Sequence, residues 1–257
     1  MSKLRNKLKN YIRNNDQIVC ITCYDAAFAK ILNDLNVDIV LVGDSLGMVI
    51  KGEHNTHNVN MSDILYHVDC VSKYKKNFIL MADMPINSFE NQEKAVINAK
   101  KMLDKEVDII KIEYQDAHKN IIEKLIFENI PVCGHLGLQP QYVIEKKDMR
   151  TYGKDSIEKR KILDQVRTLE EVGVDLILLE CVDESLSKFI TETTSTPIIG
   201  IGSGENCNGQ VQVIYDLIGI SQKPPKFAKN YLAEKNNIQL AIKSFYNYVK
   251  AIDCKKK

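Results

Sequence analysis

Charged side chains stand at the ends of several short apolar runs in this sequence, where they could serve as catalytic groups. Four are carboxylic acids, one is an amine and one is an imidazole: Asp44, Asp83, Glu113, Glu180, Lys111 and His135. Chance places a polar residue after any one strand, because every strand must end. Chance explains all six together less well, because burying a charge without a partner is costly. We therefore expect these side chains to share one site.

Three of the acids suggest a metal site. Asp44, Asp83 and Glu113 come from consecutive apolar runs, so in a barrel they would be neighbours. Oxygen ligands suit a hard cation, and a few protein ligands completed by water and substrate suit Mg²⁺ better than a Ca²⁺ cage. His54 and His57 share a loop and could suggest zinc, but no second ligand pair lies near them in the sequence, so we interpret them as surface residues.

Two further features suggest acid–base chemistry. Lys111 and Glu113 are two residues apart, so on a strand both point to the same face. They could act in catalysis or form a structural ion pair inside a barrel. Glu180 ends the very apolar run 176–179, and such surroundings raise the pKa of a carboxyl group toward the value that a general base needs near neutral pH.

The elements that must position these residues alternate along the chain. The sequence predicts eight strands, at 18–23, 39–43, 78–83, 109–113, 132–134, 176–180, 198–201 and 211–215. Amphipathic stretches between them predict helices, at 26–35, 61–74, 92–103, 119–128, 156–172 and 184–191. This α/β alternation favours parallel strands with helical crossovers. Eight units close a (β/α)8 TIM barrel, whose catalytic groups gather on one rim; a doubly wound open sheet is the alternative.

Length and composition bound the remaining possibilities. The 257 residues have a formal net charge of +1 and no composition break, so we expect one catalytic domain over 1–257 and no nucleic-acid partner. No apolar run is long enough to cross a membrane. Seven Cys favour a reducing, cytoplasmic location over a disulfide framework. Leu4, Leu8 and Ile12 recur every four residues, so the basic N-terminal segment 1–15 is predicted to be an integral helix rather than a transit peptide.

Several segments together resemble the ketopantoate hydroxymethyltransferase family. They are 21–25 (ITCYD), 41–48 (LVGDSLGM), 133–140 (CGHLGLQP), 199–202 (IGIG) and 225–229 (PKFAK). The resemblance runs from the first helix to near the C-terminus. It implies a (β/α)8 barrel, a bound Mg²⁺ and a homodecamer. It also implies transfer of a one-carbon unit from 5,10-methylenetetrahydrofolate to 3-methyl-2-oxobutanoate, which gives 2-dehydropantoate for pantothenate synthesis.

The resemblance assigns roles residue by residue. It implies that Asp44, Asp83 and Glu113 hold the metal and that Glu180 is the proton acceptor. The contacts to the oxo acid then fall on Asp44, Ser45, Asp83, Lys111 and His135. The chain departs from the family pattern at His57-Asn58, Lys147-Asp148-Met149, Ser203 and Asn208, all in predicted loops or behind the site.

Two other functions fit parts of the pattern. An enzyme of the phosphoenolpyruvate mutase and isocitrate lyase superfamily would also handle a Mg²⁺-bound enolate on a barrel, and segment 133–135 superficially resembles a catalytic loop of the lyases. A non-catalytic barrel kept for assembly is the other, since fold alone does not fix function. That second possibility predicts loss of the rim charges, and they are present.

Overall fold

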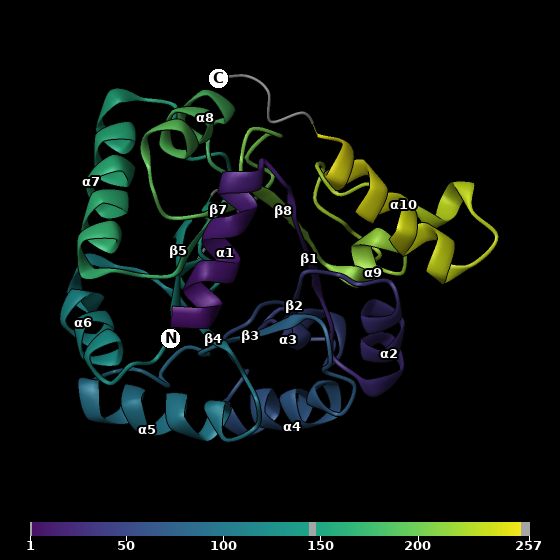
Figure 1. Ribbon diagram of the computed structural model, residues 1–257, viewed down its shortest axis with the longest axis horizontal. Coiled ribbons are helices and arrows are strands. Elements are labelled where there is room, and N and C mark those ends of the chain that lie inside the picture. The colour runs from purple at the N-terminus through teal and green to yellow at the C-terminus, as the bar shows by residue number, and fades with distance from the viewer. Residues whose placement is uncertain (1, 144–147, 253–257) are drawn as a thin grey trace.

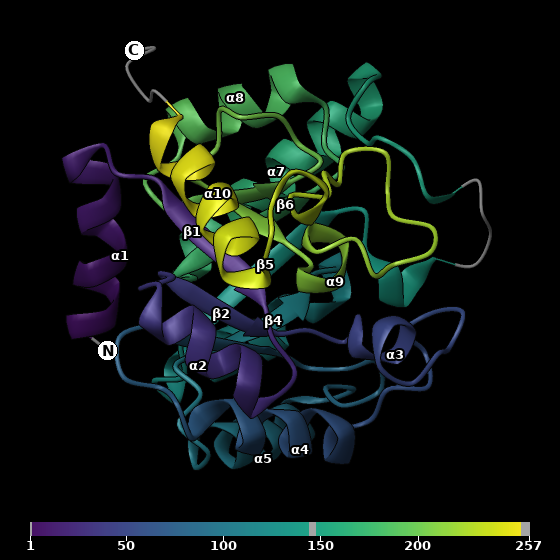
Figure 2. The same ribbon diagram turned by 90° about the vertical axis from the view of Figure 1, so that its right-hand side faces the viewer.

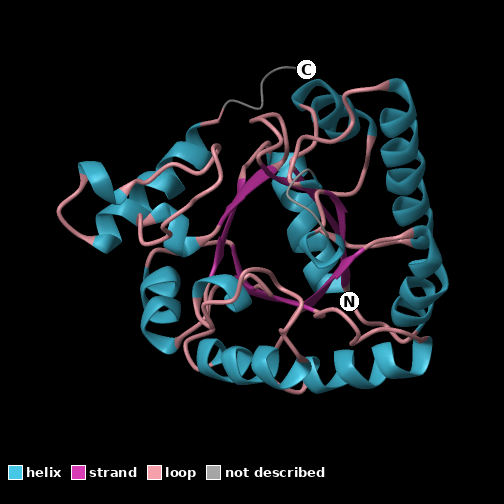
Figure 3. Cartoon of the chain, turned by 180° about the vertical axis from the view of Figure 1, so that it is seen from behind, coloured by secondary structure: helices cyan, strands magenta, loops and turns pink. Residues whose placement is uncertain are grey.

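The chain forms a closed barrel of eight parallel strands (Figures 1 and 3). The computed structural model describes residues 2–143 and 148–252. The strands pair in sequence order, and β8 closes the ring against β1. Their bounds are β1 Ile18–Thr22, β2 Ile39–Val42, β3 Ile79–Asp83, β4 Ile109–Glu113, β5 Val132–Gly137, β6 Leu176–Glu180, β7 Ile198–Ile201 and β8 Gly209–Gln212. The predicted (β/α)8 barrel is confirmed, and the open sheet is excluded.

Helices surround the barrel and bury the outward faces of its strands. They are α1 Ser2–Asn14, α2 Ala26–Asp34, α3 Leu46–Val49, α4 Met61–Ser72, α5 Gln92–Leu103, α6 Lys119–Phe127, α7 Ser156–Val172, α8 Glu184–Thr193, α9 Ile214–Leu217 and α10 Ile238–Ala251. Short 3-10 turns lie at η1 Asp116–His118, η2 Pro140–Tyr142 and η4 Leu232–Glu234. None of the helices in the described part of the chain is long and apolar enough to span a membrane.

Strand residues alternate between two apolar clusters, as the two-residue period requires. In β4, Ile110 and Ile112 pack outward against the helices, whereas Ile109 packs inside the barrel. Both faces are therefore buried, which is why the strands read as continuous apolar runs. Lys111 and Glu113 share the inward face with Ile109, so their side chains enter the barrel where the strand ends.

Helix α1 closes one opening of the barrel (Figure 1). Leu8 is fully buried among the first residues of several strands, including Ile18 and Ile39, and Tyr11 packs beside it. The predicted integral N-terminal helix is confirmed. Figure 2 places α1 and α3 at opposite ends of the molecule, so the carboxyl ends of the strands face away from α1.

Two predicted strands differ from the structure by more than one residue at an end. The fifth continues to Gly137, so His135 lies within β5 rather than after it. The eighth was predicted at 211–215, but β8 is Gly209–Gln212 and Ile214 begins α9. Gln210 and Gln212 interrupt the apolar pattern in β8, and the apolar residues after it belong to the next helix. Apolar composition alone placed this strand too late.

Candidate active site

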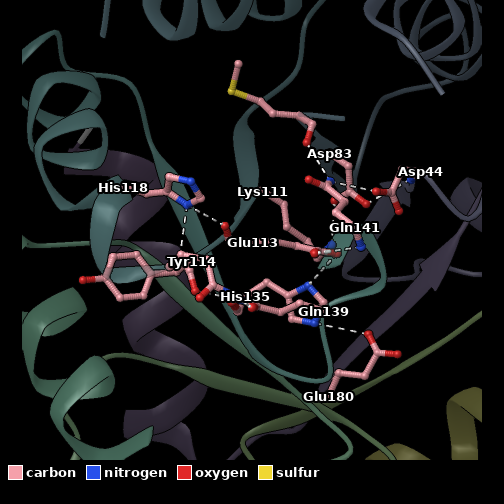
Figure 4. A network of polar contacts seen from close by, with 12 residues as sticks. Asp44, Asp83, Lys111, Glu113, Tyr114, His118, His135, Gln139, Gln141 and Glu180 are labelled. Atoms are coloured by element: carbon pink, nitrogen blue, oxygen red, sulfur yellow. Dashed lines mark hydrogen bonds and ion pairs between the residues drawn. The ribbon is translucent and has the colours of Figure 1, made fainter. Parts of the chain in front are cut away.

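All of the residues predicted to form the site meet at the end of the barrel opposite α1. Each lies within the last three residues of a strand or no more than three residues after one. Figure 4 shows six of them side by side: Asp44, Asp83, Lys111, Glu113, His135 and Glu180. Asp44, Asp83, Lys111, Glu113 and His135 are buried. The side chain of Glu180 is 19% exposed, which gives it access to a ligand entering from the rim.

Asp83 connects Lys111 to Asp44. The Lys111 Nζ donates to Asp83 Oδ1 over 2.8 Å, and the backbone N–H of Asp44 donates to Asp83 Oδ2 over 3.0 Å. Adjacent strands provide the three residues, because Asp83 is in register with Lys111 and β2 pairs with β3. Both oxygens of Asp83 are therefore held by groups from neighbouring strands.

Ser45 begins the turn into α3 beside Asp44. Its Oγ lies 2.8 Å from the hydroxyl of Tyr24, which is buried after β1. This contact orients the Ser45 hydroxyl at the rim. Gly43 precedes the pair, and a Cβ built there would lie 2.9 Å from Ser45 Oγ, so a larger residue at 43 would displace the serine.

His135 lies between two of the acids. Its Nε2 is 3.2 Å from Glu180 Oε2, and its Nδ1 is 3.6 Å from Glu113 Oε1. Neither nitrogen is aligned for a hydrogen bond within the described chain. Burial, and then the charge of Lys111, lower the pKa of His135 well below its ordinary value, so the imidazole is neutral. A neutral imidazole that is not otherwise engaged can still contact a ligand at the rim.

The acids outnumber the cations that could neutralise them. Burial and the nearby Asp83 raise the pKa of Asp44 to about 7. Burial, together with Asp44, also raises the pKa of Glu113 well above its usual range. Burial alone would lower the pKa of Lys111, but the surrounding carboxylates outweigh burial and raise it. The amine is therefore charged at neutral pH, and one cation faces four acids.

Glu180 has the pKa that was predicted for a general base. Burial raises the pKa of this carboxyl to about 7, against the opposing effect of Lys111. It can therefore accept and release a proton near neutral pH, as a general base requires.

Sequence reasoning missed Gln141, which lies in η2 and reaches across the rim. Its side-chain Nε2 donates to Asp44 Oδ2 over 2.8 Å and to the backbone oxygen of Met84 over 3.0 Å. Its backbone N–H donates to Glu113 Oε2 over 3.0 Å. The side chain is buried (Figure 4). No sequence signal marks this residue beyond its place shortly after the fifth strand.

Gln139, two residues earlier, was also missed. Its Nε2 donates to the backbone oxygens of Tyr114 and His135, over 2.8 and 2.6 Å, and its Oε1 accepts from Gln115. These contacts tie the turn after β5 to the end of β4. Unlike Gln141, this amide makes no hydrogen bond to a carboxylate of the site.

The carboxylate oxygens of Asp44, Asp83 and Glu113 are ligands that suit a hard cation, although the three side chains are not arranged around a common point. Asp44, Asp83 and Glu113 lie at the ends of consecutive strands, and Glu113 Oε1 is buried with no hydrogen-bond partner in the described part of the chain. A divalent cation would supply the positive charge that these acids lack. Within residues 2–143 and 148–252, no three His, Cys, Asp or Glu side chains already form a metal-binding cluster, so a zinc site at His54 and His57 gains no support.

Most departures from the family pattern have structural roles. Ser203 Oγ accepts from the backbone N–H of Val182 and donates to the backbone oxygen of Leu179. Asn208 Oδ1 accepts from the backbone N–H of Ile198. The His57 N–H donates to Asn55 in an exposed loop. Lys147 lies outside the described residues.

Comparison with known proteins places the chain in a family. A family model described as "Ketopantoate hydroxymethyltransferase" matches residues 3–254. The chain belongs to the ketopantoate hydroxymethyltransferase family. A curated relative from Ruthia magnifica subsp. Calyptogena magnifica, named 3-methyl-2-oxobutanoate hydroxymethyltransferase, is 42% identical over 95% of this chain and 94% of its own length. A relative of the same name from Pyrobaculum aerophilum is 37% identical over 96% and 94%.

Solved structures share the fold at low sequence identity. A 2,3-dimethylmalate lyase of the PEP mutase/isocitrate lyase superfamily has a TM-score of 0.64 and 11% identity, with 96% of each chain covered. A phosphonopyruvate hydrolase solved with oxalate and Mg²⁺ has a TM-score of 0.61 and 10% identity, with 98% of this chain and 99% of the other covered. At these identities the likeness concerns the barrel alone, so the family match decides between the two enzyme classes.

Proposed function

We propose that the protein transfers a hydroxymethyl group from 5,10-methylenetetrahydrofolate to 3-methyl-2-oxobutanoate and so forms 2-dehydropantoate. The family match and the names of its relatives support this reaction. The reaction needs a base for the C3 proton and positive charge near the keto oxygen. Glu180 and Lys111 are the groups at the rim that suit these two tasks.

The oxo acid would bind among the residues of the rim. Lys111 would place its charge beside the keto oxygen, where negative charge develops as the proton leaves. The Ser45 hydroxyl and the neutral His135 would contact the remaining oxygens, beside Asp44 and Asp83. Mg²⁺ held by Asp44, Asp83 and Glu113 would act as a Lewis acid that acidifies C3.

Glu180 would remove the C3 proton. Its partly exposed carboxyl group stands next to His135 at the rim, and a pKa of about 7 leaves about half of it ionised and able to accept a proton at neutral pH. The enolate so formed would attack the methylene carbon carried by the folate. This attack would form the new carbon–carbon bond and break the bond from the methylene carbon to one folate nitrogen. Water would then replace the second folate nitrogen on that carbon and supply the hydroxyl group. Tetrahydrofolate would leave with the electrons of both broken carbon–nitrogen bonds and with two protons, one from C3 and one from the water.

One observation carries the proposal: four acids and one lysine, from the ends of β2, β3, β4 and β6, lie together on one rim in a chain of this family. The test is turnover of the purified protein with both substrates and MgCl₂, with 2-dehydropantoate followed by mass spectrometry. We expect product that depends on both substrates and is abolished by EDTA. Background-level product at saturating Mg²⁺ would refute the activity and favour a non-catalytic barrel.

A second assay addresses the superfamily alternative. We expect no cleavage of isocitrate or phosphonopyruvate under the same conditions. Turnover of either compound above the rate of hydroxymethyl transfer would reverse the assignment.

The proposal also covers the domain organisation, the oligomeric state and the cellular location of the protein. We propose that residues 1–257 act as one catalytic domain, that ten copies assemble into a homodecamer, and that the enzyme works in the cytoplasm. Light scattering coupled to size-exclusion chromatography should give ten times the chain mass. A monomer at micromolar concentration would contradict the decamer and leave the activity assay independent of it.

A further inference from the structure

Gln141 is placed to organise the acids of the rim, although it carries no charge. Its three donated hydrogen bonds end on residues that follow or terminate three consecutive strands: Asp44 after β2, Met84 after β3 and Glu113 in β4. Gln141 itself follows β5. This one residue therefore spans the same three strand ends that present the candidate metal ligands.

The contacts of Gln141 differ from those of Gln139 in the same turn. The side-chain N–H groups of Gln139 donate to two backbone carbonyls. Gln141 instead directs N–H groups to two carboxylates, one from its side chain and one from its backbone. Its Oε1 is buried and has no hydrogen-bond partner among the described residues. A fully satisfied structural role would leave no such atom.

The geometry points to Gln141 as a positioning residue that holds the carboxylates of Asp44 and Glu113 side by side for a divalent cation. This inference rests on the proposed metal site. The side-chain amide fixes Oδ2 of Asp44, and the backbone N–H fixes Oε2 of Glu113. Among the described residues, no hydrogen bond to these two groups engages Asp44 Oδ1 or Glu113 Oε1. These two oxygens are the ones available to a cation.

The hydrogen bond to Met84 makes this placement rigid. The same Nε2 that donates to Asp44 also donates to the Met84 carbonyl, so the amide cannot rotate without breaking both bonds. Residues that orient metal ligands by hydrogen bonds typically change metal affinity by about 10- to 100-fold when they are replaced. Removal of the amide should therefore weaken cation binding through Asp44. It should leave Glu180 in place, because the Gln141 amide donates to Asp44 and Met84 and not to Glu180.

The test is Mg²⁺ binding by isothermal titration calorimetry in the full-length protein. Gln141→Met keeps the length of the side chain and the backbone N–H but removes both side-chain hydrogen bonds. We expect its Mg²⁺ dissociation constant to rise by about tenfold or more. Gln141→Asn keeps the amide on a shorter side chain and should give a smaller rise, and it decides the question should the methionine variant fail to fold.

Gln139→Met is the matched control in the same turn. It also removes a buried amide, but one that bonds only to backbone oxygens and to Gln115. Its Mg²⁺ affinity should stay within about twofold of that of the wild type. An unchanged affinity in the Gln141 variant, or an equal loss in the Gln139 control, would overturn the inference.

A kinetic readout separates positioning from general loss of structure. In Gln141→Met, the KM for the oxo acid at fixed Mg²⁺ should rise, while the maximal rate of C3 proton exchange stays within about threefold, because Glu180 makes no hydrogen bond to Gln141. An equal fall in the maximal rate would contradict the assigned role. Failure of the wild-type protein to transfer the one-carbon unit would instead refute the proposed function itself.

Discussion

The two ends of the barrel differ in how completely their acidic side chains are paired. At the end closed by α1, Asp38 accepts from Tyr11, from the backbone N–H of Val19 and from Lys250. Asp175 there accepts from Arg5 and from the backbone N–H of Val132. These acids lie beside an apolar plug with both of their oxygens bonded.

At the opposite rim the charges are left incompletely paired. One lysine faces four acids, and Glu113 Oε1 has no hydrogen bond within residues 2–143 and 148–252. The pKa values of Asp44 and Glu180 rise to about 7. A buried charged group without a full set of partners destabilises an ordinary protein core, but at a binding site a ligand can supply the missing partner. We infer from this comparison that the α1 end stabilises the fold. The rim is less stable than full pairing would make it, because its groups are placed for the proposed ligand binding and proton transfer.

The largest expected effect comes from replacing Glu180, the proposed base at the rim. Glu180→Gln keeps the size of the side chain but cannot accept the C3 proton. We expect exchange of that proton with solvent to fall by about 10²–10⁴-fold, with oxo-acid binding retained. Exchange is followed by NMR in D₂O, and binding by calorimetry.

The exposed Glu171 in α7 provides the control for this variant. Glu171→Gln makes the same chemical change away from the rim and should leave exchange unaltered. Normal exchange in Glu180→Gln would remove Glu180 from its assigned role.

At the end closed by α1, we expect a mutation to lower the stability of the fold without changing C3 proton exchange. Leu8→Ala leaves a cavity among the first residues of the strands, and the free energy of unfolding should fall by about 2–5 kcal/mol. The exchange rate per folded molecule should be unchanged. Urea unfolding measures the first quantity, and Asn6→Ala on the exposed side of the same helix should shift it by less than about 0.5 kcal/mol.

The sequence predicted the closed end and most of the barrel because both depend on apolar pattern. Strands such as β4 and β6 were predicted with their observed bounds, since burial on both faces makes them continuous apolar runs. Leu8 was predicted through its helical spacing. Strand β8 was misplaced because Gln210 and Gln212 broke the apolar pattern on which the prediction relied.

At the rim, the sequence predicted the residues carried by strands but missed those carried by the turn after β5. Asp83, Glu113 and Glu180 stand at strand ends, where topology alone brings them together. Gln141 is 97 residues from Asp44, and its contact depends on the path of an irregular turn. Such a turn has no period from which the direction of a side chain could be inferred.

The two ends should also respond differently to pH. The pKa of Glu180 is raised from 4.5 to about 7, so its carboxylate form, and with it proton exchange, should increase from pH 6 to 8 and then level off. Between pH 4.5 and 7 the folded state holds this proton and the unfolded state does not. The contribution of Glu180 to stability should therefore fall as pH rises through that window.

Between pH 6 and 7, the rate of C3 proton exchange by the Mg²⁺-bound enzyme should therefore rise, while the contribution of Glu180 to the free energy of unfolding of the metal-free protein falls. Glu180→Gln should remove the Glu180 part of the stability change. The loss caused by Leu8→Ala should be the same at pH 6 and pH 8, because Leu8 does not titrate. A pH-dependent loss in Leu8→Ala would show that the two ends are coupled.

The smallest expected effect concerns the hydrogen bond that fixes α1 to the barrel. Tyr11→Phe removes the hydroxyl that donates to Asp38 Oδ1 over 2.8 Å but keeps the ring that packs beside Leu8. Asp38 retains the backbone N–H of Val19 and the amine of Lys250, so we expect a loss of about 1 kcal/mol in urea unfolding. Exchange at the rim should be unaffected, because Asp38 precedes β2 whereas Asp44 follows it. A loss as large as that of Leu8→Ala would mean that α1 is held by this polar contact rather than by its apolar face.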